Sequence, residues 1–414
     1  MRIKAVRGTK DILPYDAKIW RLIEDKARSL LELYCYQEIR TPLLEEARLF
    51  TRSIGESSDI VRKEMYSFKD RKERVLCLRP EGTASVVRAY LEHDLDQSEQ
   101  LSKFYYFGPM FRAERPQAGR LRQFHHIGVE AIGSGSPYLD AEVITLAVRI
   151  LEHTGVNNFT VHLNSIGSQQ DREEFKSLIS TALKSKIKEL CPDCHSRLKT
   201  NVLRIFDCKN TSCQAVTRQL PPITQALGSQ SKEHFLQVQK LLDTLSIPYT
   251  LNPFLVRGLD YYTTTCFEIV HPNLGAQNAL GAGGRYDSLV SDLGGPPRPA
   301  VGFALGMERL IAAKIVEPGE PGPGMRVFIA VLGDQAQPLA FSLLNSLRGE
   351  GISAEMNYQD KSLKSQMRLA DKLAAANVVI IGEEEVKKQK VILRNMRDKT
   401  QKEVEIARLA QELE

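Results

Sequence analysis

Two periods of hydrophobic and polar positions alternate along the N-terminal part of this 414-residue chain. Residues 17–34 carry apolar side chains at helical spacing, and the segment YQEIRTPLLEE that follows is strand-like and ends near Pro42. Short strand-like runs then outnumber the helices between them: VLCLRP, KFYYFGPMFRAE, QFHHIGVEAIG, FTVHLNS, CFEIVH and VGFAL. The pattern predicts an α+β fold around a mainly antiparallel sheet.

The pattern changes twice farther along the chain, and these changes predict the domain boundaries. Residues 168–246 are helical and polar, which predicts a helical insertion between two parts of the sheet domain, residues 1–167 and 247–317. The segment PGEPGPG, residues 318–324, cannot continue a helix or a strand and predicts an exposed linker. Residues 325–414 then alternate strand, helix, strand, helix and strand, which predicts a small α/β domain.

Composition adds limits to this picture. With 42% hydrophobic and 26% charged residues, the chain is neither disordered nor fibrous. No run approaches the roughly 18 apolar residues of a membrane span, and the N-terminus lacks an apolar signal segment, so we expect a cytoplasmic protein without a membrane partner. The odd count of seven cysteines, with Cys35 and Cys77 in apolar or strand-like surroundings, argues against a disulfide framework. The net charge of +5 permits a polyanionic partner without requiring one.

The segment MFRAERPQAGRLRQF places a cluster of arginines in a predicted hairpin loop between two strand-like runs. The cluster consists of Arg112, Arg115, Arg120 and Arg122. Guanidinium groups suit bidentate recognition of phosphate and carboxylate, and the neighbouring Phe124 could stack on a base. The alternative is a solvated charged hairpin in which Glu114 is the partner of the arginines.

A second candidate site is the segment LVRGLDYYTTTCFEIV. Arg257 lies among apolar and aromatic residues there, so it should meet Asp260, another carboxylate or an anionic ligand. If Tyr261 and Tyr262 lie on a strand, they face opposite ways and at most one lines a pocket. A purely structural Arg–Asp pair is the alternative.

Two other clusters allow more than one interpretation. Six glycines between Gly275 and Gly295, around GAGGRYD, permit either close approach to a ligand or a tight turn, and match no Walker or dinucleotide fingerprint. The adjacent His125 and His126 would face opposite ways on a strand, so they cannot chelate one metal together.

Four cysteines have the spacing C-x2-C-x13-C-x4-C: Cys191, Cys194, Cys208 and Cys213. Such a cluster in a reducing setting could hold a structural zinc ion, and four protein ligands would leave no open coordination position. Because the second pair departs from the usual C-x2-C spacing, the sequence favours buried or incidental thiols.

Five ordered segments resemble the histidyl-tRNA synthetase family. They are RPEGT (79–83), FRAERPQAGRLRQFHHIGVE (111–130), LVRGLDYYT (255–263), GAGGRYD (281–287) and AVGFALGMERL (300–310). FRAE and GMER are similar to motifs 2 and 3 of class II aminoacyl-tRNA synthetases, and RGLDYY and GGRYD to histidine-specific segments within that class. The resemblance implies a class II antiparallel-sheet catalytic domain with a helical insertion, followed by an α/β anticodon-binding domain.

The resemblance also implies an activity: ATP, with Mg2+, activates L-histidine to histidyl-adenylate, and the 3′ end of histidine tRNA then accepts the histidyl group. It implies that Arg112 holds the α-phosphate, that Phe124 stacks on adenine, that Arg309 faces the γ-phosphate, and that Glu114 belongs to the ATP site. Arg257 matches the residue that supports displacement at the α-phosphate, where other class II enzymes use a metal ion. Cations near the phosphates would stabilise charge that develops in the transition state.

For the amino acid, the resemblance implies a pocket that is polar at both ends. Its expected residues are Glu81, Gly82 and Thr83 around the α-amino group, Glu130 and Tyr262 at the imidazole, and Tyr261 and Tyr286 along the wall. A carboxylate and a phenol suit an imidazole, which offers one donor and one acceptor. This sequence departs from the family at His126, where Gln is usual and contacts the substrate's amino end. We expect an altered pH dependence between about pH 6 and 8 from this histidine.

The remaining implications concern partners. The helix and strand before Pro42 resemble motif 1, which implies a homodimer. The helical insertion would approach the acceptor stem, Arg115 and Gln117 would meet its end, and the C-terminal domain would read the anticodon. One competing interpretation is the synthetase-like regulatory subunit of ATP phosphoribosyltransferase, which typically lacks the C-terminal domain and the catalytic arginine. Another is a non-catalytic RNA- or zinc-binding interaction protein.

Overall fold

The computed structural model describes residues 3–55, 58–98, 101–117, 119–183, 186–200, 202–313, 325–359 and 362–413. They belong to two compact units, Met1–Ile315 and Val316–Glu414. The predicted linker, residues 318–324, lies outside the described residues. Within the described residues, no helix is long and apolar enough to cross a membrane.

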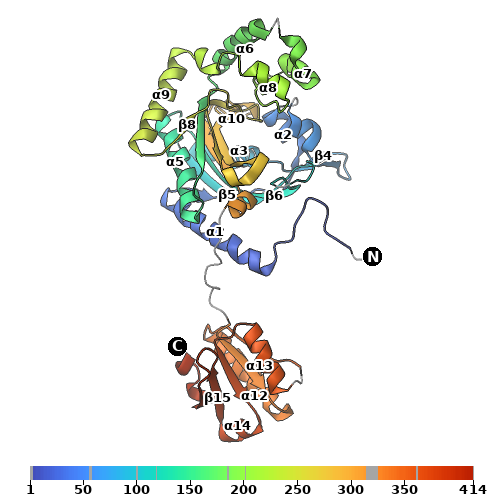
Figure 1. Ribbon diagram of the computed structural model, residues 1–414, viewed down its shortest axis with the longest axis vertical. Coiled ribbons are helices and arrows are strands. Elements are labelled where there is room, and N and C mark those ends of the chain that lie inside the picture. The colour runs from blue at the N-terminus through green and yellow to red at the C-terminus, as the bar shows by residue number, and fades with distance from the viewer. Residues whose placement is uncertain are drawn as a thin grey trace. The chain divides into compact units, whose positions relative to one another are not determined.

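The larger unit is built on an eight-stranded sheet with the order β1-β5-β6-β11-β10-β9-β7-β8 (Figure 1). The six central strands pair antiparallel, and the two short outer strands pair parallel with their neighbours. This confirms the predicted antiparallel sheet. The strands are β1 Gln37–Glu38, β5 Ser102–Phe111, β6 Gln123–Ile132, β7 Thr160–Ser165, β8 Thr250–Leu251, β9 Thr263–Val270, β10 Ala279–Arg285 and β11 Ala300–Gly306.

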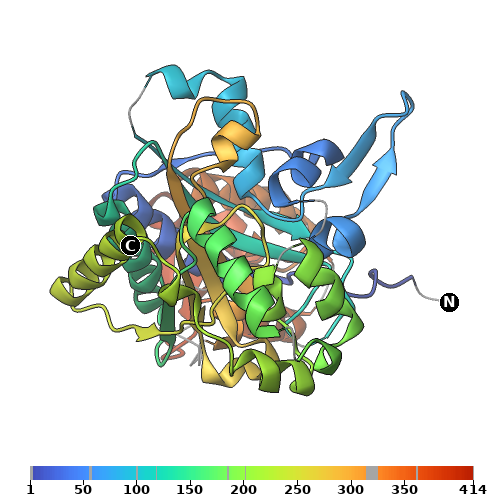
Figure 2. The ribbon, with the colours of Figure 1, turned by 90° about the horizontal axis from the view of Figure 1, so that it is seen from above.

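Long helices cover one face of this sheet. They are α1 Pro14–Leu33, α5 Pro137–Thr154 and α9 Ser229–Thr244, joined by the short α11 Met307–Ala313. Their apolar side chains form one buried core with β6, β9 and β11, and α9 lies beside α5 (Figure 2). Asp140 of α5 ties these layers together, because it pairs with Arg285 of β10 at 2.6 Å and with His234 of α9 at 2.8 Å.

The other face of the sheet carries smaller elements around a second core. They include α2 Ala47–Ile54, the π-helical turn Ile60–Glu64, α3 Thr83–Glu92, α4 Leu95–Ser98 and α10 Leu289–Asp292. A separate three-stranded sheet, β2-β4-β3, adjoins them and consists of β2 Leu44–Glu46, β3 Ser67–Lys69 and β4 Val75–Leu78.

One sequence prediction about these strands was wrong. The segment YQEIRTPLLEE is not one strand: it divides into β1 and β2, which belong to different sheets on either side of Pro42, a residue without a backbone N–H for a ladder. The glycines of GAGGRYD, for which the sequence left two alternatives open, lie in the central strand β10. A Cβ at Gly283 would overlap the backbone of β11, so glycine permits this close strand packing.

The described residues of the stretch predicted as a helical insertion form four α-helices. They are α6 Gln169–Leu183, α7 Pro192–Thr200, α8 Thr211–Thr217 and α9. The first three lie together at one end of the sheet (Figure 1), whereas α9 returns to the helical layer of the sheet.

The smaller unit contains the predicted strand–helix alternation and continues beyond it. Its sheet has the order β13-β12-β14-β15-β16, in which the first three strands are parallel and the last two antiparallel. The elements are β12 Val327–Val331, α12 Gln337–Gly349, β13 Ala354–Met356, α13 Leu363–Lys372, β14 Asn377–Ile381, α14 Glu383–Lys388, β15 Lys390–Asn395 and β16 Gln401–Glu405. The hairpin of β15 and β16 was not predicted, because β16 is mostly polar and exposed.

Candidate active site

A cleft of about 900 Å3 opens on the sheet face opposite α1 and α5. Its size is typical of a site for a small ligand. It brings together most of the predicted site residues: Glu81, Gly82, Thr83, Arg112, Glu114, Gln117, Phe124, His126, Arg257, Tyr261, Tyr262, Tyr286 and Arg309. Among the residues predicted for histidine, ATP and the tRNA end, Glu130 and Arg115 do not line the cleft.

Glu81 lies just before α3 and lines the cleft. Its carboxylate accepts hydrogen bonds from the backbone N–H groups of Thr83 at 2.6 Å and Ala84 at 2.9 Å. Only 3% of Glu81 is exposed, and this burial raises the pKa of its carboxyl group. Gly82 is required beside it, because a Cβ there would overlap the ring of Tyr106. The helix terminus therefore fixes a carboxylate in an almost dry part of the cleft.

Glu130 is buried directly behind this part of the cleft wall, with 1% of its surface exposed. Its carboxyl oxygens accept hydrogen bonds from the hydroxyls of Thr83 at 2.7 Å, Tyr106 at 3.2 Å and Tyr286 at 2.5 Å. All three donors line the cleft. Burial raises the pKa of Glu130 to about 8. Glu130, which was predicted to contact the imidazole, is thus connected to the cleft through three hydroxyl groups.

Tyr261 and Tyr262 both line the cleft, so the expectation that at most one would do so was wrong. The reason is local: Tyr261 lies in a turn, and β9 begins only at Thr263, so the alternation of a strand does not apply. Their rings pack 4.8 Å apart, and the ring of Tyr286 lies 5.7 Å from that of Tyr261. Together they form a nearly buried aromatic wall.

The cleft also contains positively charged side chains. Arg112 donates a hydrogen bond to the carbonyl of Pro80 at 3.0 Å, and its guanidinium lies 5.3 Å from the centre of the Phe124 ring. Arg309 donates to the carbonyls of Gly119 and Ala279. Burial and the nearby charge of Arg112 lower the pKa of Arg309. Two guanidinium groups held mainly by carbonyls retain their positive charge for an anionic ligand.

Arg257 contributes a third guanidinium group to the cleft. Its carboxylate partner is Glu268 of β9, at 2.8 Å, and its guanidinium lies 5.9 Å from the centre of the Tyr262 ring. Its buried Nε makes no hydrogen bond within the described residues. Arg257 therefore pairs with Glu268 rather than with the predicted Asp260, which agrees with one of the alternatives left open by the sequence. Its Nε–H can still donate a hydrogen bond to a ligand.

Only some side chains of the arginine hairpin line the cleft. Arg120 pairs with Glu114 at 2.8 Å, as the interpretation of a charged hairpin requires, and also donates to the side chain of Gln277 at 3.1 Å. Arg115 and Gln117 are exposed in the loop. The hairpin thus combines internal pairing with side chains that remain accessible.

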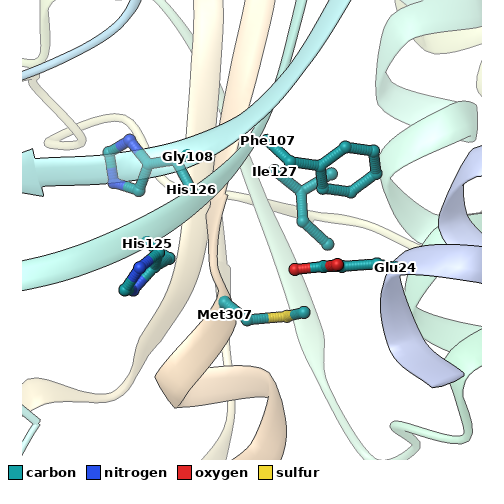
Figure 3. Close-up of a pocket in the computed structure, with 7 residues that line it drawn as sticks. All are labelled: Glu24, Phe107, Gly108, His125, His126, Ile127 and Met307. Carbon is teal, nitrogen blue, oxygen red and sulfur yellow. The ribbon is translucent and has the colours of Figure 1, made fainter. Parts of the chain in front are cut away.

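Strand β6 directs the two adjacent histidines to opposite faces, as predicted. The ring of His126 lies 5.1 Å from that of Phe124 on the cleft side. The ring of His125 lies 4.8 Å from Trp20 of α1, and its Nδ1 is 2.9 Å from Glu308. A small cavity of about 130 Å3 separates the sheet from α1 at this point (Figure 3), lined by Glu24, Phe107, Gly108, His125, His126, Ile127 and Met307.

The surroundings of His126 argue against the expected change of pH dependence between pH 6 and 8. Burial and the positive charge of Arg112 lower the pKa of His126 to about 3. The imidazole is therefore neutral throughout that range. Its buried Nδ1 has no hydrogen-bond partner within the described residues. A neutral ring can still offer one donor and one acceptor in place of an amide.

Several residues of the site were not identified from the sequence, namely Tyr106, Glu268 and Gly302. Tyr106 and Glu130 are diagonal neighbours on paired strands, because Tyr106 pairs with Gly128 in the β5–β6 register. Gly302 pairs with Glu130 in the β6–β11 register, and a Cβ there would overlap the Glu130 carboxylate. Alternation places these residues on one face, but only the register shows which of them meet.

The antiparallel sheet with short parallel strands at its edges, and the arginine-rich cleft on one face, define a class II aminoacyl-tRNA synthetase. The family model for histidyl-tRNA synthetase matches residues 8–310, and the model for an anticodon binding domain matches residues 326–414. The chain belongs to the histidyl-tRNA synthetase family.

Individual relatives agree with this assignment. The chain is 48% identical to the histidine–tRNA ligase of Thermodesulfovibrio yellowstonii, over 99% of this chain and 97% of that protein. It is 46% identical to that of Syntrophotalea carbinolica, over 100% and 98% of the two chains. The solved apo histidyl-tRNA synthetase of S. aureus matches with a TM-score of 0.84 and 40% identity over the whole of both chains.

A more distant structure shares the fold alone. It is an ATP phosphoribosyltransferase regulatory subunit/histidyl-tRNA synthetase from Bacillus halodurans, with a TM-score of 0.66 and 21% identity, over 92% of this chain and 99% of that one.

Proposed function

We propose that this chain ligates L-histidine to histidine tRNA in two steps, with MgATP as the activating substrate. The observation that carries this function is the combination of groups in one cleft. Arg112 and Arg309 supply positive charge, and Tyr286 connects the cleft to the buried carboxyl group of Glu130. A phosphate chain and a histidine can then meet in the same cleft.

In the first step, the α-carboxylate of histidine attacks the α-phosphorus of ATP and pyrophosphate leaves. Arg112 holds the α-phosphate, Phe124 stacks on adenine, and Arg309 neutralises the γ-phosphate. Glu114 holds Arg120 in the wall of the ATP site through their ion pair. Arg257 donates to the α-phosphate oxygens, where charge increases in the transition state. Mg2+ enters with the outer phosphates as part of the substrate.

Histidine itself is held at both ends. Glu81, fixed just before α3, accepts hydrogen bonds from the α-amino group together with Thr83. Gly82 has no side chain that would overlap the ring of Tyr106 in this wall. Glu130 and Tyr262 read the imidazole, and Tyr261 and Tyr286 enclose it. A buried polar pocket of this kind rejects side chains that leave its groups unpaired.

In the second step, the 3′-terminal hydroxyl of histidine tRNA attacks the histidyl carbonyl and AMP leaves. The exposed Arg115 and Gln117 meet the acceptor end, and the helical insertion at residues 168–246 approaches the acceptor stem. The domain at residues 325–414 reads the anticodon, as its family match supports. We infer in addition a homodimer formed through the motif 1 region before Pro42, and a cytoplasmic location.

The regulatory-subunit interpretation is disfavoured by two features that such a subunit typically lacks. Residues 326–414 match an anticodon binding domain, and Arg257 lies in the cleft. A non-catalytic interaction protein does not explain why arginines and buried polar groups meet in one cleft.

The test of the proposed function is charging of histidine tRNA with labelled histidine and ATP. Charging of histidine tRNA alone among tRNA species supports the proposal, and no charging by an active preparation would contradict it.

His126 supplies a prediction about pH. Because its pKa is about 3, the imidazole stays neutral from pH 6 to 8, and the ratio of kcat/KM for histidine between the parent and His126→Gln should not change with pH in this range. This ratio is the appropriate measurement, because kcat/KM reports the pKa values of the free enzyme. A ratio that changes several-fold around the ordinary histidine pKa of about 6.5 would show that His126 titrates there.

A further inference from the structure

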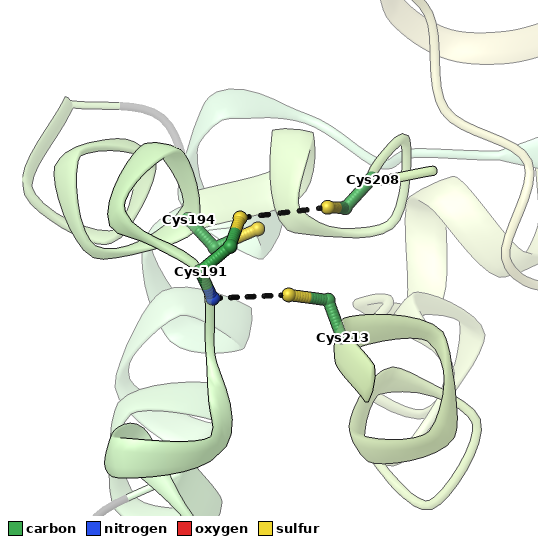
Figure 4. Close-up of side chains that lie close together, drawn as sticks. All are labelled: Cys191, Cys194, Cys208 and Cys213. Carbon is green, nitrogen blue, oxygen red and sulfur yellow. Dashed lines mark hydrogen bonds between the residues drawn. The ribbon is translucent and has the colours of Figure 1, made fainter. Parts of the chain in front are cut away.

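Four cysteine side chains converge within the region of α6, α7 and α8. Their Sγ atoms all lie within 4.8 Å of one another: Cys191, Cys194, Cys208 and Cys213. Three of the four are buried. Figure 4 shows that they come from separate segments, namely the entry and first turn of α7, the loop after it, and α8. Segments distant in sequence thus direct four soft ligands toward one point.

The spacing of the sulfur atoms fits a tetrahedral metal site. A Zn–S bond of about 2.3 Å places the sulfur atoms of a tetrahedron about 3.8 Å apart. Cys191 and Cys208 are separated by 3.8 Å (Figure 4), and every other pair lies within 4.8 Å. Small side-chain rotations therefore complete the geometry. All four thiols are free, and the Cys191–Cys208 distance is well beyond the bond length of a disulfide.

The surroundings also suit a thiolate cluster. A site of four thiolates and one Zn2+ ion carries a net negative charge. The backbone N–H of Cys191 donates to Sγ of Cys213 at 3.1 Å. Arg197 interacts electrostatically with Cys194 and Cys208 and brings a positive charge next to the cluster. The neighbouring His195 is directed elsewhere, since its Nε2 lies 3.1 Å from the carbonyl of Leu190. Outer groups of this kind stabilise ligating sulfur atoms.

We propose that Cys191, Cys194, Cys208 and Cys213 together bind one structural Zn2+ ion. The convergence of the four thiols, which spacing alone does not reveal, favours this site over incidental cysteines. The helices α7 and α8 have 9 and 7 residues and are too short to be stable by themselves. A metal ion that cross-links them would therefore stabilise this region. Four protein ligands leave no open position for catalysis.

The same cluster faces the catalytic part of the unit through charged contacts. Arg197 and Arg204 both pair with Asp59, at 3.4 Å and 3.0 Å. Asp59 immediately precedes the π-helical turn Ile60–Glu64. The carbonyl of Glu64 in this turn accepts a hydrogen bond from the backbone N–H of Ala113, at the beginning of the arginine hairpin. The zinc ion therefore positions the helical region against the cleft without touching substrate.

The test uses the untagged full-length protein. Elemental analysis should find about one zinc ion per chain, and Cys208→Ser should reduce this content at least about fivefold. The matched control is Cys35→Ser, because Cys35 is an exposed cysteine outside the cluster and its loss should leave the zinc content unchanged. Iron in place of zinc, or equal zinc contents in the parent and Cys208→Ser, would overturn the proposal.

A second measurement covers the case in which Cys208→Ser fails to fold. The parent protein, freed of metal by a chelator, should bind Co2+ with the spectrum of tetrahedral thiolate coordination, and Zn2+ should displace it. A metal-free parent that binds no Co2+ while it remains folded would contradict the site. Metal content is independent of histidine activation, so failure of this proposal and failure of the ligase function are distinguishable.

Discussion

Replacing Arg257 with alanine should lower kcat for histidine-dependent ATP–pyrophosphate exchange by at least ~100-fold. The guanidinium lies in the cleft, 2.8 Å from Glu268, and its buried Nε makes no hydrogen bond within the described residues. It is thus positioned to donate where charge develops on the α-phosphate. The loss should fall on kcat more than on KM for histidine, because the interaction strengthens in the transition state.

Two controls separate chemistry from local structure. Arg257→Ala leaves the Glu268 carboxylate without its arginine partner, so the double variant Arg257→Ala/Glu268→Gln removes that unpaired charge as well. If the double variant recovers parental exchange, the loss came from Glu268 and the assigned role of Arg257 is wrong. Arg149→Ala, which removes a half-exposed arginine on α5, should leave exchange unchanged.

The second large effect is expected at Glu130. Replacing it with glutamine should lower kcat/KM for histidine by roughly 100-fold, because an amide cannot accept all three hydroxyl donors and leaves buried groups unpaired. Tyr286→Phe removes one donor only and should cost about tenfold or less. Steady-state exchange at varied histidine concentration measures both. Equal kcat/KM values in the parent and Glu130→Gln would refute the role of this carboxyl group.

A pH series tests the same residue without substrate. The unfolded chain releases the Glu130 proton near the ordinary pKa of 4.5, whereas the folded chain holds it until about pH 8. The free energy of unfolding of the parent should therefore fall, relative to Glu130→Gln, as the pH rises through this interval. Urea denaturation of both proteins at pH 5 and pH 8 makes the comparison. A difference that stays constant would mean that the folded pKa is not raised.

The sequence predicts the parts of the fold in which a local pattern determines the structure. Strands β5 and β6 are long runs of apolar and aromatic residues that enclose the arginine hairpin, and α1 has the periodicity of a helix with one buried face. The prediction was wrong where local pattern and tertiary context disagree. Tyr261 and Tyr262 resemble the beginning of a strand, but both precede β9 and Tyr261 lies in a turn. The glycines of β10, for which the pattern left two alternatives open, pack between two strands.

The site follows the same rule. Most of the substrate-site residues that motif resemblance identified line the cleft, whereas Tyr106, Glu268 and Gly302 depend on strand register, which no short motif encodes. The burial of Glu130 behind the wall likewise depends on how three strands and α3 meet. The cysteine cluster is clearer in the structure than in the spacing, because folding of α7 and α8 brings the two pairs together.

The most direct test of the central claim is ATP–pyrophosphate exchange by the purified chain with each of the standard amino acids in turn. The cleft predicts exchange with L-histidine and background rates with the others, because an imidazole offers one donor and one acceptor to the polar groups around the pocket. Exchange that does not depend on histidine, or that proceeds equally well with another amino acid, would contradict the assignment.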